Sequence, residues 1–236
     1  MLWYKTWLET RSRFLTSLTV LTLFSSLFVH HAQGFLHHDS KTDFYRLLFI
    51  THEYIVVLWI LSAVLLGMGG LVREHATGTS SLTLSLPVSR ACLLGARIAV
   101  GVLEAIALGV VPWLAIFVVS YAGGMPVLFP QVIIYMFLLV AGGLAYFAMA
   151  ILVSSLAEGE YTAPAVAFGL VFLATILFDA WLRRFNLWRL VTGSFSIDRS
   201  TYLLSPHFPW PATLASLSVA ALLFLASVRI IRRRDF

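Results

Sequence analysis

The stretch QVIIYMFLLVAGGLAYFAMAILVSS, residues 131–155, decides the fold. It contains no charged residue, and a helix needs about 20 mostly apolar residues to cross about 30 Å of hydrocarbon. Strands of a membrane barrel would instead alternate apolar and polar residues over about 10 positions. Because this run is continuously apolar, we predict a membrane-spanning α-helix here.

The rest of the chain has the same character. Of its 236 residues, 60% are hydrophobic and only 11% are charged, and the mean hydropathy is +0.91. A soluble domain carries about 25% charged residues, so this composition excludes a soluble enzyme and a disordered chain. The single cysteine, Cys92, excludes an internal disulfide framework. We therefore expect an integral membrane protein surrounded by lipid.

Five further apolar runs complete the prediction. The fold class is all-α, with one membrane domain over residues 1–236 and six spans at about 14–33, 52–72, 91–121, 131–155, 162–182 and 211–231. Residues 1–13 precede the first span and are amphipathic, with Trp3, Trp7 and Leu8 on one face and Lys5, Glu9 and Arg13 on the other. Such a segment is typical of a helix that lies in the membrane interface.

The basic residues predict the orientation. Ten of the sixteen Lys and Arg residues fall at the N-terminus, between spans two and three or at the C-terminus. Cytoplasmic connections carry an excess of Lys and Arg, so we expect both termini in the cytoplasm and the chain in the cytoplasmic membrane. This role accounts for the net charge of +5, and no nucleic-acid partner is expected.

The connection between spans two and three carries the signals of a short helix. Gly78 ends the preceding helix, Thr79 is a good N-cap and Pro87 stops the new helix. Leu82 and Leu86 are four residues apart and would share one apolar face. The residues alone leave two interpretations open, a helix that docks a partner protein and an ordinary interfacial turn.

A family resemblance favours the first interpretation. Glu74, the pair Gly78-Thr79, the run 87–90 (PVSR), and Gly95 with a basic residue after it are similar to the signature of the membrane subunits of ATP-binding cassette exporters, the type 2 exporter permeases. The layout of the whole chain is similar as well. Two positions depart from the family pattern: Ser81 stands where an acidic residue is common, and Arg97 stands where Lys is common.

The resemblance implies a partner and a mechanism. Residues 1–13 would be the elbow helix of the family, and the segment between spans two and three would be a coupling helix that docks on a separate cytoplasmic ATPase. The coupling residues would be Glu74, Gly78, Thr79, Leu82, Leu86, Pro87 and Arg90.

The resemblance also implies how the complex is assembled. A second permease chain, identical or homologous, would pair with this one, and a helical outer segment would lie between spans five and six. The chain has no GxxxxGK[ST] phosphate loop. It should therefore be no enzyme and bind no cofactor, and ATP and Mg²⁺ would be held by the ATPase. The motion would move a substrate out of the cell. Alternatively, it would drive a cell-envelope machine through an envelope or periplasmic protein.

Glu104 is the candidate intramembrane charge. An ionisable side chain at membrane depth is costly and is a functional hypothesis by default. Arg97 precedes it by seven residues, about 10 Å along a helix, which is too far for direct contact. The other interpretation places Glu104 near the interface or against another helix.

The histidines suggest a further alternative. His30, His31, His37 and His38, with His52 after them, fall near one end of spans one and two, where a metal-linked or proton-linked site is conceivable. Adjacent pairs lack the i,i+3 or i,i+4 spacing that ligands on one helix face require. We therefore expect solvated interfacial histidines and no metal.

Overall fold

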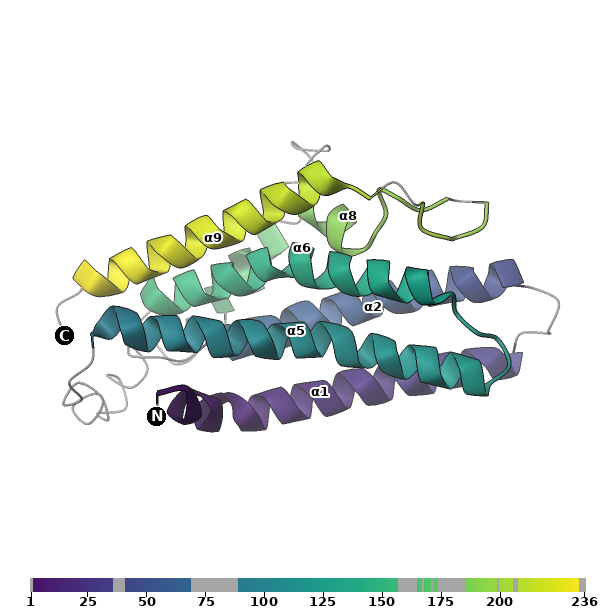
Figure 1. The fold of residues 1–236 in the computed structure, drawn as a ribbon, viewed down its shortest axis with the longest axis horizontal. Helices are drawn as coiled ribbons and strands as arrows, with labels where there is room; N and C mark the ends of the chain where they lie inside the picture. The colour runs from purple at the N-terminus through teal and green to yellow at the C-terminus, as the bar shows by residue number, and fades with distance from the viewer. Residues whose placement is uncertain are drawn as a thin grey trace.

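The computed structural model is built of long, nearly aligned helices (Figure 1). The residues that the structure describes are 2–35, 41–68, 89–156, 165–166, 168–170, 172–173, 186–198, 200–205 and 208–233.

Five long helices and one short helix are described. The long ones are α1 (Leu2–Phe35), α2 (Lys41–Gly67), α5 (Arg90–Ala122), α6 (Phe129–Leu156) and α9 (Trp210–Arg233), and the short one is α8 (Leu187–Val191). All five long helices are long and apolar enough to cross a membrane. The prediction of an all-helical, multi-pass membrane protein is therefore confirmed for the described part of the chain.

The predicted fifth span, 162–182, lies mostly outside the described residues. Three of the other predictions match closely, because α5, α6 and α9 begin and end within about two residues of the expected spans. The count of six spans stays a prediction.

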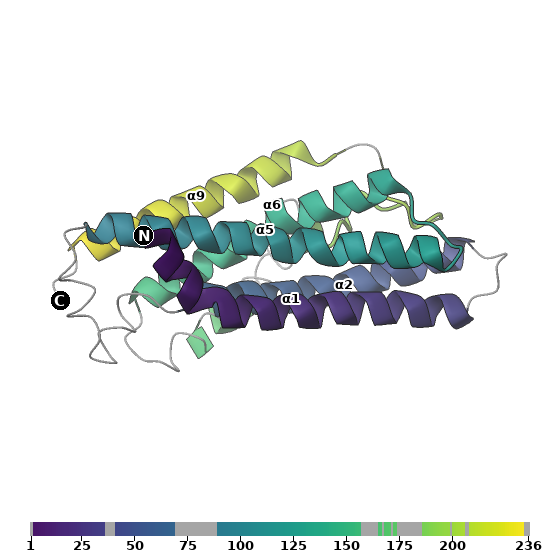
Figure 2. The ribbon, with the colours of Figure 1, turned by 60° about the horizontal axis from the view of Figure 1, so that its bottom comes forward.

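The first two spans differ from their predicted bounds. Residues 1–13 do not form a separate helix among the described residues, because α1 runs continuously from Leu2 to Phe35. No Gly or Pro occurs in residues 2–33 to interrupt it. Figure 2 shows the first turns of α1 at an angle to the rest of that helix.

Helix α2 begins at Lys41, well before the predicted start at residue 52. The charged residues Asp43 and Arg46 interrupt the apolar run, but they do not interrupt the helix. Asp43 lies in the first turn, where a negative charge is favourable to the helix dipole.

Helix α6 is the central helix of the bundle. It contacts α2, α5, α8 and α9, whereas α1 packs along α5 and α2 (Figures 1 and 2). Large buried side chains between these helices include Trp59, Trp113, Tyr135 and Phe147. Glycines allow the close contacts: a Cβ at Gly109 of α5 would lie 2.6 Å from Val140 of α6, and one at Gly67 of α2 would lie 2.8 Å from Ala150.

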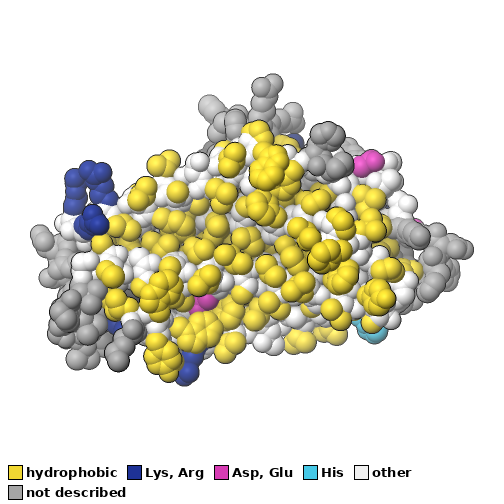
Figure 3. Space-filling view, in the orientation of Figure 1, with side chains coloured by type: hydrophobic (Ala, Val, Ile, Leu, Met, Phe, Trp, Pro, Cys, Tyr) yellow, Lys and Arg dark blue, Asp and Glu magenta, His cyan; other side chains and the backbone are white. Residues whose placement is uncertain are grey.

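The outer surface is apolar. Hydrophobic side chains cover the face seen in Figure 3, and Lys and Arg gather toward the end that holds both termini. Leu103, Val118, Leu222 and Leu225 are among the large exposed side chains. So much exposed apolar surface is expected where lipid replaces water as the solvent.

Candidate functional site

Most of the predicted coupling residues lie outside the described residues. These are Glu74, Gly78, Thr79, Leu82, Leu86 and Pro87, which belong to the undescribed segment 69–88. Arg90 is the first residue of α5. Just before it, Ser89 caps the helix, and its side chain accepts a hydrogen bond from the backbone N–H of Cys92 at 3.3 Å.

Two arginines bind the backbone that immediately precedes the segment 69–88. The last described residue before it is Met68, whose carbonyl accepts one hydrogen bond from Arg97 Nη2 and another from Arg13 Nη1, each at 2.9 Å. Arg13 Nη1 also reaches the carbonyl of Leu65, at 3.4 Å. These carbonyls belong to the end of α2, where backbone acceptors have no partner within the helix. Arg13 of α1 and Arg97 of α5 therefore complete the end of α2.

A carboxylate of α1 balances this positive charge. Glu9 Oε2 lies 3.8 Å from Arg97 Nη1, and Glu9 Oε1 lies 3.6 Å from Lys5 Nζ. The Arg97 side chain is only 11% exposed, whereas that of Glu9 is 37% exposed. Arg97 thus joins α1, the end of α2 and the first turns of α5 in one cluster.

Glu104 is more deeply buried than Arg97 and Glu9. It is 3% exposed, and the hydroxyl of Thr10 on α1 forms a short hydrogen bond with its Oε1. Its other oxygen, Oε2, has no hydrogen-bond partner among the residues that the structure describes. Arg97 pairs with Glu9, and Glu104 contacts Thr10 of another helix.

We call these residues the α1–α5 junction; its members are Lys5, Glu9, Thr10, Arg13, Met68, Arg97 and Glu104. Its hydrogen bonds and ion pairs hold α1, α5 and the end of α2 together. Sequence reasoning assigned Lys5, Glu9 and Arg13 to a water-facing side of α1. Their spacing of four residues was the available signal, because it aligns all three on one helix face.

The described histidines, His30, His31 and His52, do not gather into a site. His30 and His31 are exposed near the end of α1, and His37 and His38 lie outside the described residues. Within the described ranges, no group of three or more His, Cys, Asp or Glu side chains could hold a metal ion.

His52 differs from the expectation of a solvated histidine. It is fully buried in α2, and its Nε2 lies 3.0 Å from the carbonyl of Val191 at the end of α8. A carbonyl only accepts, so Nε2 carries the hydrogen. The ring also contacts Trp113 and Tyr135, whose rings stack with centroids 4.5 Å apart. The sequence did not reveal this role, because His52 lies within an apolar run and its partner Val191 is 139 positions away in the chain.

A second polar contact holds the segment that follows α8. The side chain of Gln131 on α6 donates to the carbonyl of Leu204 at 3.1 Å and accepts from the backbone N–H of Leu204 at 2.9 Å. Leu204 also pairs with Ile197 in an isolated antiparallel bridge. Asp198 and Ser200 lie in the turn between Ile197 and Leu204. The backbone N–H and the hydroxyl of Ser200 donate hydrogen bonds to Asp198, which lower the pKa of that carboxyl below its usual range.

The predicted outer segment between spans five and six is thus partly described. It contains the five-residue helix α8 followed by a turn. Asn186 is buried and caps α8, accepting a hydrogen bond from the backbone N–H of Arg189 at 3.3 Å.

The family comparison agrees with this architecture. The model of the ABC-2 family transporter proteins matches residues 11–187, which include most of α1, all of α2, α5 and α6, and the first residue of α8. No curated protein matches the chain. This match over about three quarters of the chain, in a structure with five described helices able to span a membrane, establishes the assignment. The chain belongs to the ABC-2 family of transporter proteins.

Proposed function

We propose that this protein is the membrane subunit of an ATP-binding cassette exporter and is driven by a separate ATPase that docks on residues 74–90. The family assignment supports a transmembrane transporter subunit. The absence of a GxxxxGK[ST] motif from the sequence supports ATP hydrolysis on another chain.

The α1–α5 junction carries this proposal. The segment 69–88 is anchored before its start by Met68 and after its end by Arg97, and these two residues are hydrogen-bonded to each other. A force applied to the segment by an ATPase would therefore reach α2 and α5 together. Through Glu9 and Arg13 it would reach the first turns of α1 as well.

The charge distribution supports a cytoplasmic location for this end of the bundle. Both chain ends, the end of α2 and the start of α5 lie together at one end in Figure 1. The described basic residues there include Arg11, Arg13, Arg97, Arg232 and Arg233. Because short cytoplasmic segments are enriched in Lys and Arg, we place the junction and the docking segment on the ATPase side of the cytoplasmic membrane. A second permease chain would complete the transport path.

Affinity purification tests the proposal. The full-length tagged chain, solubilised from its native membrane, should copurify with a protein that contains a phosphate loop and hydrolyses ATP. A preparation without any nucleotide-binding subunit would contradict the proposal.

Two matched variants locate the docking surface. Leu82→Arg should remove the copurified ATPase, because it places a charge on the expected apolar docking face. Ser12→Arg adds the same charge to an exposed position of α1 at the same end of the bundle and should retain the ATPase. Equal retention by both variants would refute the assignment of the segment 74–90.

A further inference from the structure

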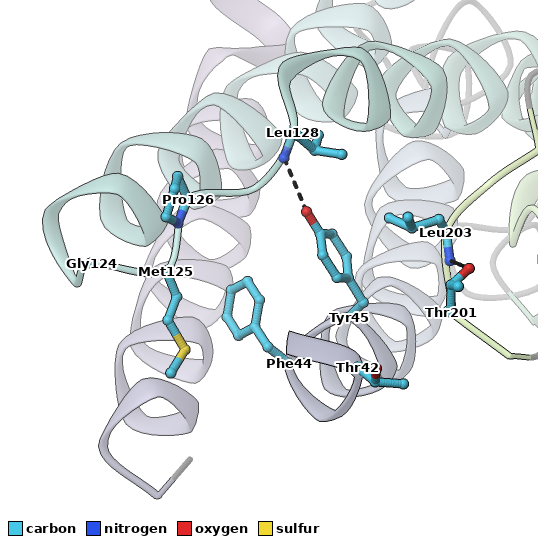
Figure 4. A pocket seen from close by; sticks show the side chains of 9 residues that line it. All are labelled: Thr42, Phe44, Tyr45, Gly124, Met125, Pro126, Leu128, Thr201 and Leu203. Carbon is cyan, nitrogen blue, oxygen red and sulfur yellow. Dashed lines mark hydrogen bonds between the residues drawn. The ribbon is translucent and has the colours of Figure 1, made fainter. Parts of the chain in front are cut away.

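A pocket of about 570 Å³ lies at the end of the bundle opposite the two chain termini. Its walls come from the first turns of α2, the connection between α5 and α6, and the segment 200–205 (Figure 4). Pockets that take small ligands have volumes of about 300–1,000 Å³, so this one is large enough for a small ligand or one chain of a lipid.

The interior of the pocket is mainly apolar. Phe44 and Met125 lie next to each other in Figure 4, and Leu128 and Leu203 contribute further apolar surface. Tyr45 points its hydroxyl at the backbone N–H of Leu128, from which it accepts a hydrogen bond at 3.4 Å. This contact holds the α2 wall and the α5–α6 wall at a fixed separation.

The neighbourhood of the pocket carries a positive charge. Arg46 follows Tyr45 in α2, and its guanidinium carbon lies 6.0 Å from the centre of the Tyr202 ring, at the edge of cation–π range. Tyr202 stands between the lining residues Thr201 and Leu203. Its φ of 54° is uncommon for a residue other than glycine, and such backbone conformations gather at functional sites.

No carboxylate neutralises Arg46 among the described residues. The exposed side chain of Asp198, in the same segment as Tyr202, is already hydrogen-bonded to Ser200. Arg46 is exposed, so its charge is accessible to a group outside the chain.

The position of the pocket points to the membrane interface. Tyr121 in the last turn of α5 and Phe129 in the first turn of α6 are exposed beside the connection that lines the pocket. Trp3 and Tyr4 are exposed at the other end of the bundle. Aromatic side chains gather at the two levels where a membrane meets water, so the pocket opens at the level of the lipid headgroups.

We propose that this pocket binds an anionic amphiphile, with its apolar part against Phe44, Met125 and Leu203 and its acidic head beside Arg46. The apolar walls, the exposed cation next to them and the interfacial level each match one part of such a molecule. The proposal goes beyond the proposed function, because the pocket lies far from the docking segment and its occupancy requires no ATPase. A fatty acid and an anionic phospholipid share the required chemistry.

Photolabelling tests the proposal. The full-length chain in nanodiscs of zwitterionic lipid is irradiated with a diazirine-bearing fatty acid, and labelled peptides are mapped by mass spectrometry. Labels should concentrate in 41–46, 124–128 and 200–205. Thr42→Trp should reduce that labelling at least severalfold by filling the pocket, whereas Ser218→Trp, on an exposed face of α9, should not. Labelling unaffected by Thr42→Trp would overturn the proposal.

A charge comparison tests the role of Arg46. The matching diazirine fatty alcohol should label the pocket about fivefold less than the acid, as expected for one solvent-exposed ionic contact. Arg46→Gln should abolish this difference, Arg46→Lys should retain it, and Arg11→Gln, at the other end of the bundle, should leave it unchanged. Equal labelling by acid and alcohol in the unmodified chain would contradict the proposal.

Competition separates the two sources of the ligand. If the natural occupant is a fatty acid, unlabelled fatty acid should displace the probe at lower concentration than an anionic phospholipid does. The reverse order would identify the phospholipid, and displacement by neither would overturn the proposal.

Discussion

Arg97 of α5 and Glu9 of α1 form an ion pair with 3.8 Å between Nη1 and Oε2, while Nη2 of the same arginine donates to the carbonyl of Met68 at the end of α2. One side chain thus connects three helices beside the segment on which we expect an ATPase to dock. The contact joins chain regions that no local sequence pattern relates.

Removing Arg97 should destabilise the bundle more than removing its carboxylate partner does. Glu9→Gln should lower the free energy of unfolding by less than about 1 kcal/mol, because Glu9 is well exposed. Arg97→Gln should cost about 1–3 kcal/mol, since it also leaves the Met68 carbonyl without one donor. Unfolding of the reconstituted chain by a denaturing detergent measures both, and Arg11→Gln is the control. Equal effects for all three variants would show that the junction contributes nothing.

The buried hydrogen bond between Thr10 and Glu104 should contribute more to the free energy of unfolding than the hydrogen bond of an exposed threonine on the same helix. Thr10→Val removes the one hydrogen-bond partner of Glu104 among the described residues. It should lower the free energy of unfolding by about 1–3 kcal/mol, the usual cost of an unsatisfied buried polar group. Glu104→Gln, which can still bond to Thr10, should cost less than Thr10→Val.

Thr16→Val is the matched control for this pair. Thr16 is an exposed threonine of the same helix, and its hydroxyl donates to the carbonyl of Ser12 at 2.8 Å. Its replacement should change the free energy of unfolding by less than about 0.5 kcal/mol. A Thr10→Val variant as stable as Thr16→Val would mean that the hydrogen bond between Thr10 and Glu104 contributes nothing to the free energy of unfolding.

The hydrogen bond from His52 should hold α8 against the bundle. His52→Phe keeps an aromatic ring beside Trp113 but removes the donor to the Val191 carbonyl. Amide hydrogen exchange in residues 187–193 should become faster, by roughly tenfold if about 1.4 kcal/mol of local stability is lost. His31→Phe, at an exposed position of α1, should leave it unchanged. Unaltered exchange in His52→Phe would contradict this role.

Gln131 should stabilise the segment that follows α8, residues 196–205, in the same way. Gln131→Leu removes both hydrogen bonds to Leu204, so exchange in residues 196–205 should accelerate by about tenfold or more. Residues 187–191 should respond less, because His52 still holds them. The same pattern of acceleration in the His52 and Gln131 variants would show that the two contacts act as a single unit.

The apolar runs predicted the class of the protein and the bounds of three helices closely. Hydropathy is a local property, and α5, α6 and α9 are uninterrupted apolar segments, so their ends could be predicted from neighbouring residues alone. The prediction was wrong for α2 because Asp43 and Arg46 end the apolar run without ending the helix. The start of α1 differs from the predicted start of the first span because the amphipathic and apolar segments form one continuous helix.

The sequence alone also determined that the chain is a membrane protein without a phosphate loop, and its motif between spans two and three indicated the transporter family to which the chain belongs. Only the tertiary structure decided which polar side chains meet. Glu104 lies 94 positions from Thr10, and His52 lies 139 positions from Val191. Buried polar groups must find partners where helix packing brings them together. That packing depends on the shapes of all the helices at once, so periodicity within one helix could not reveal it.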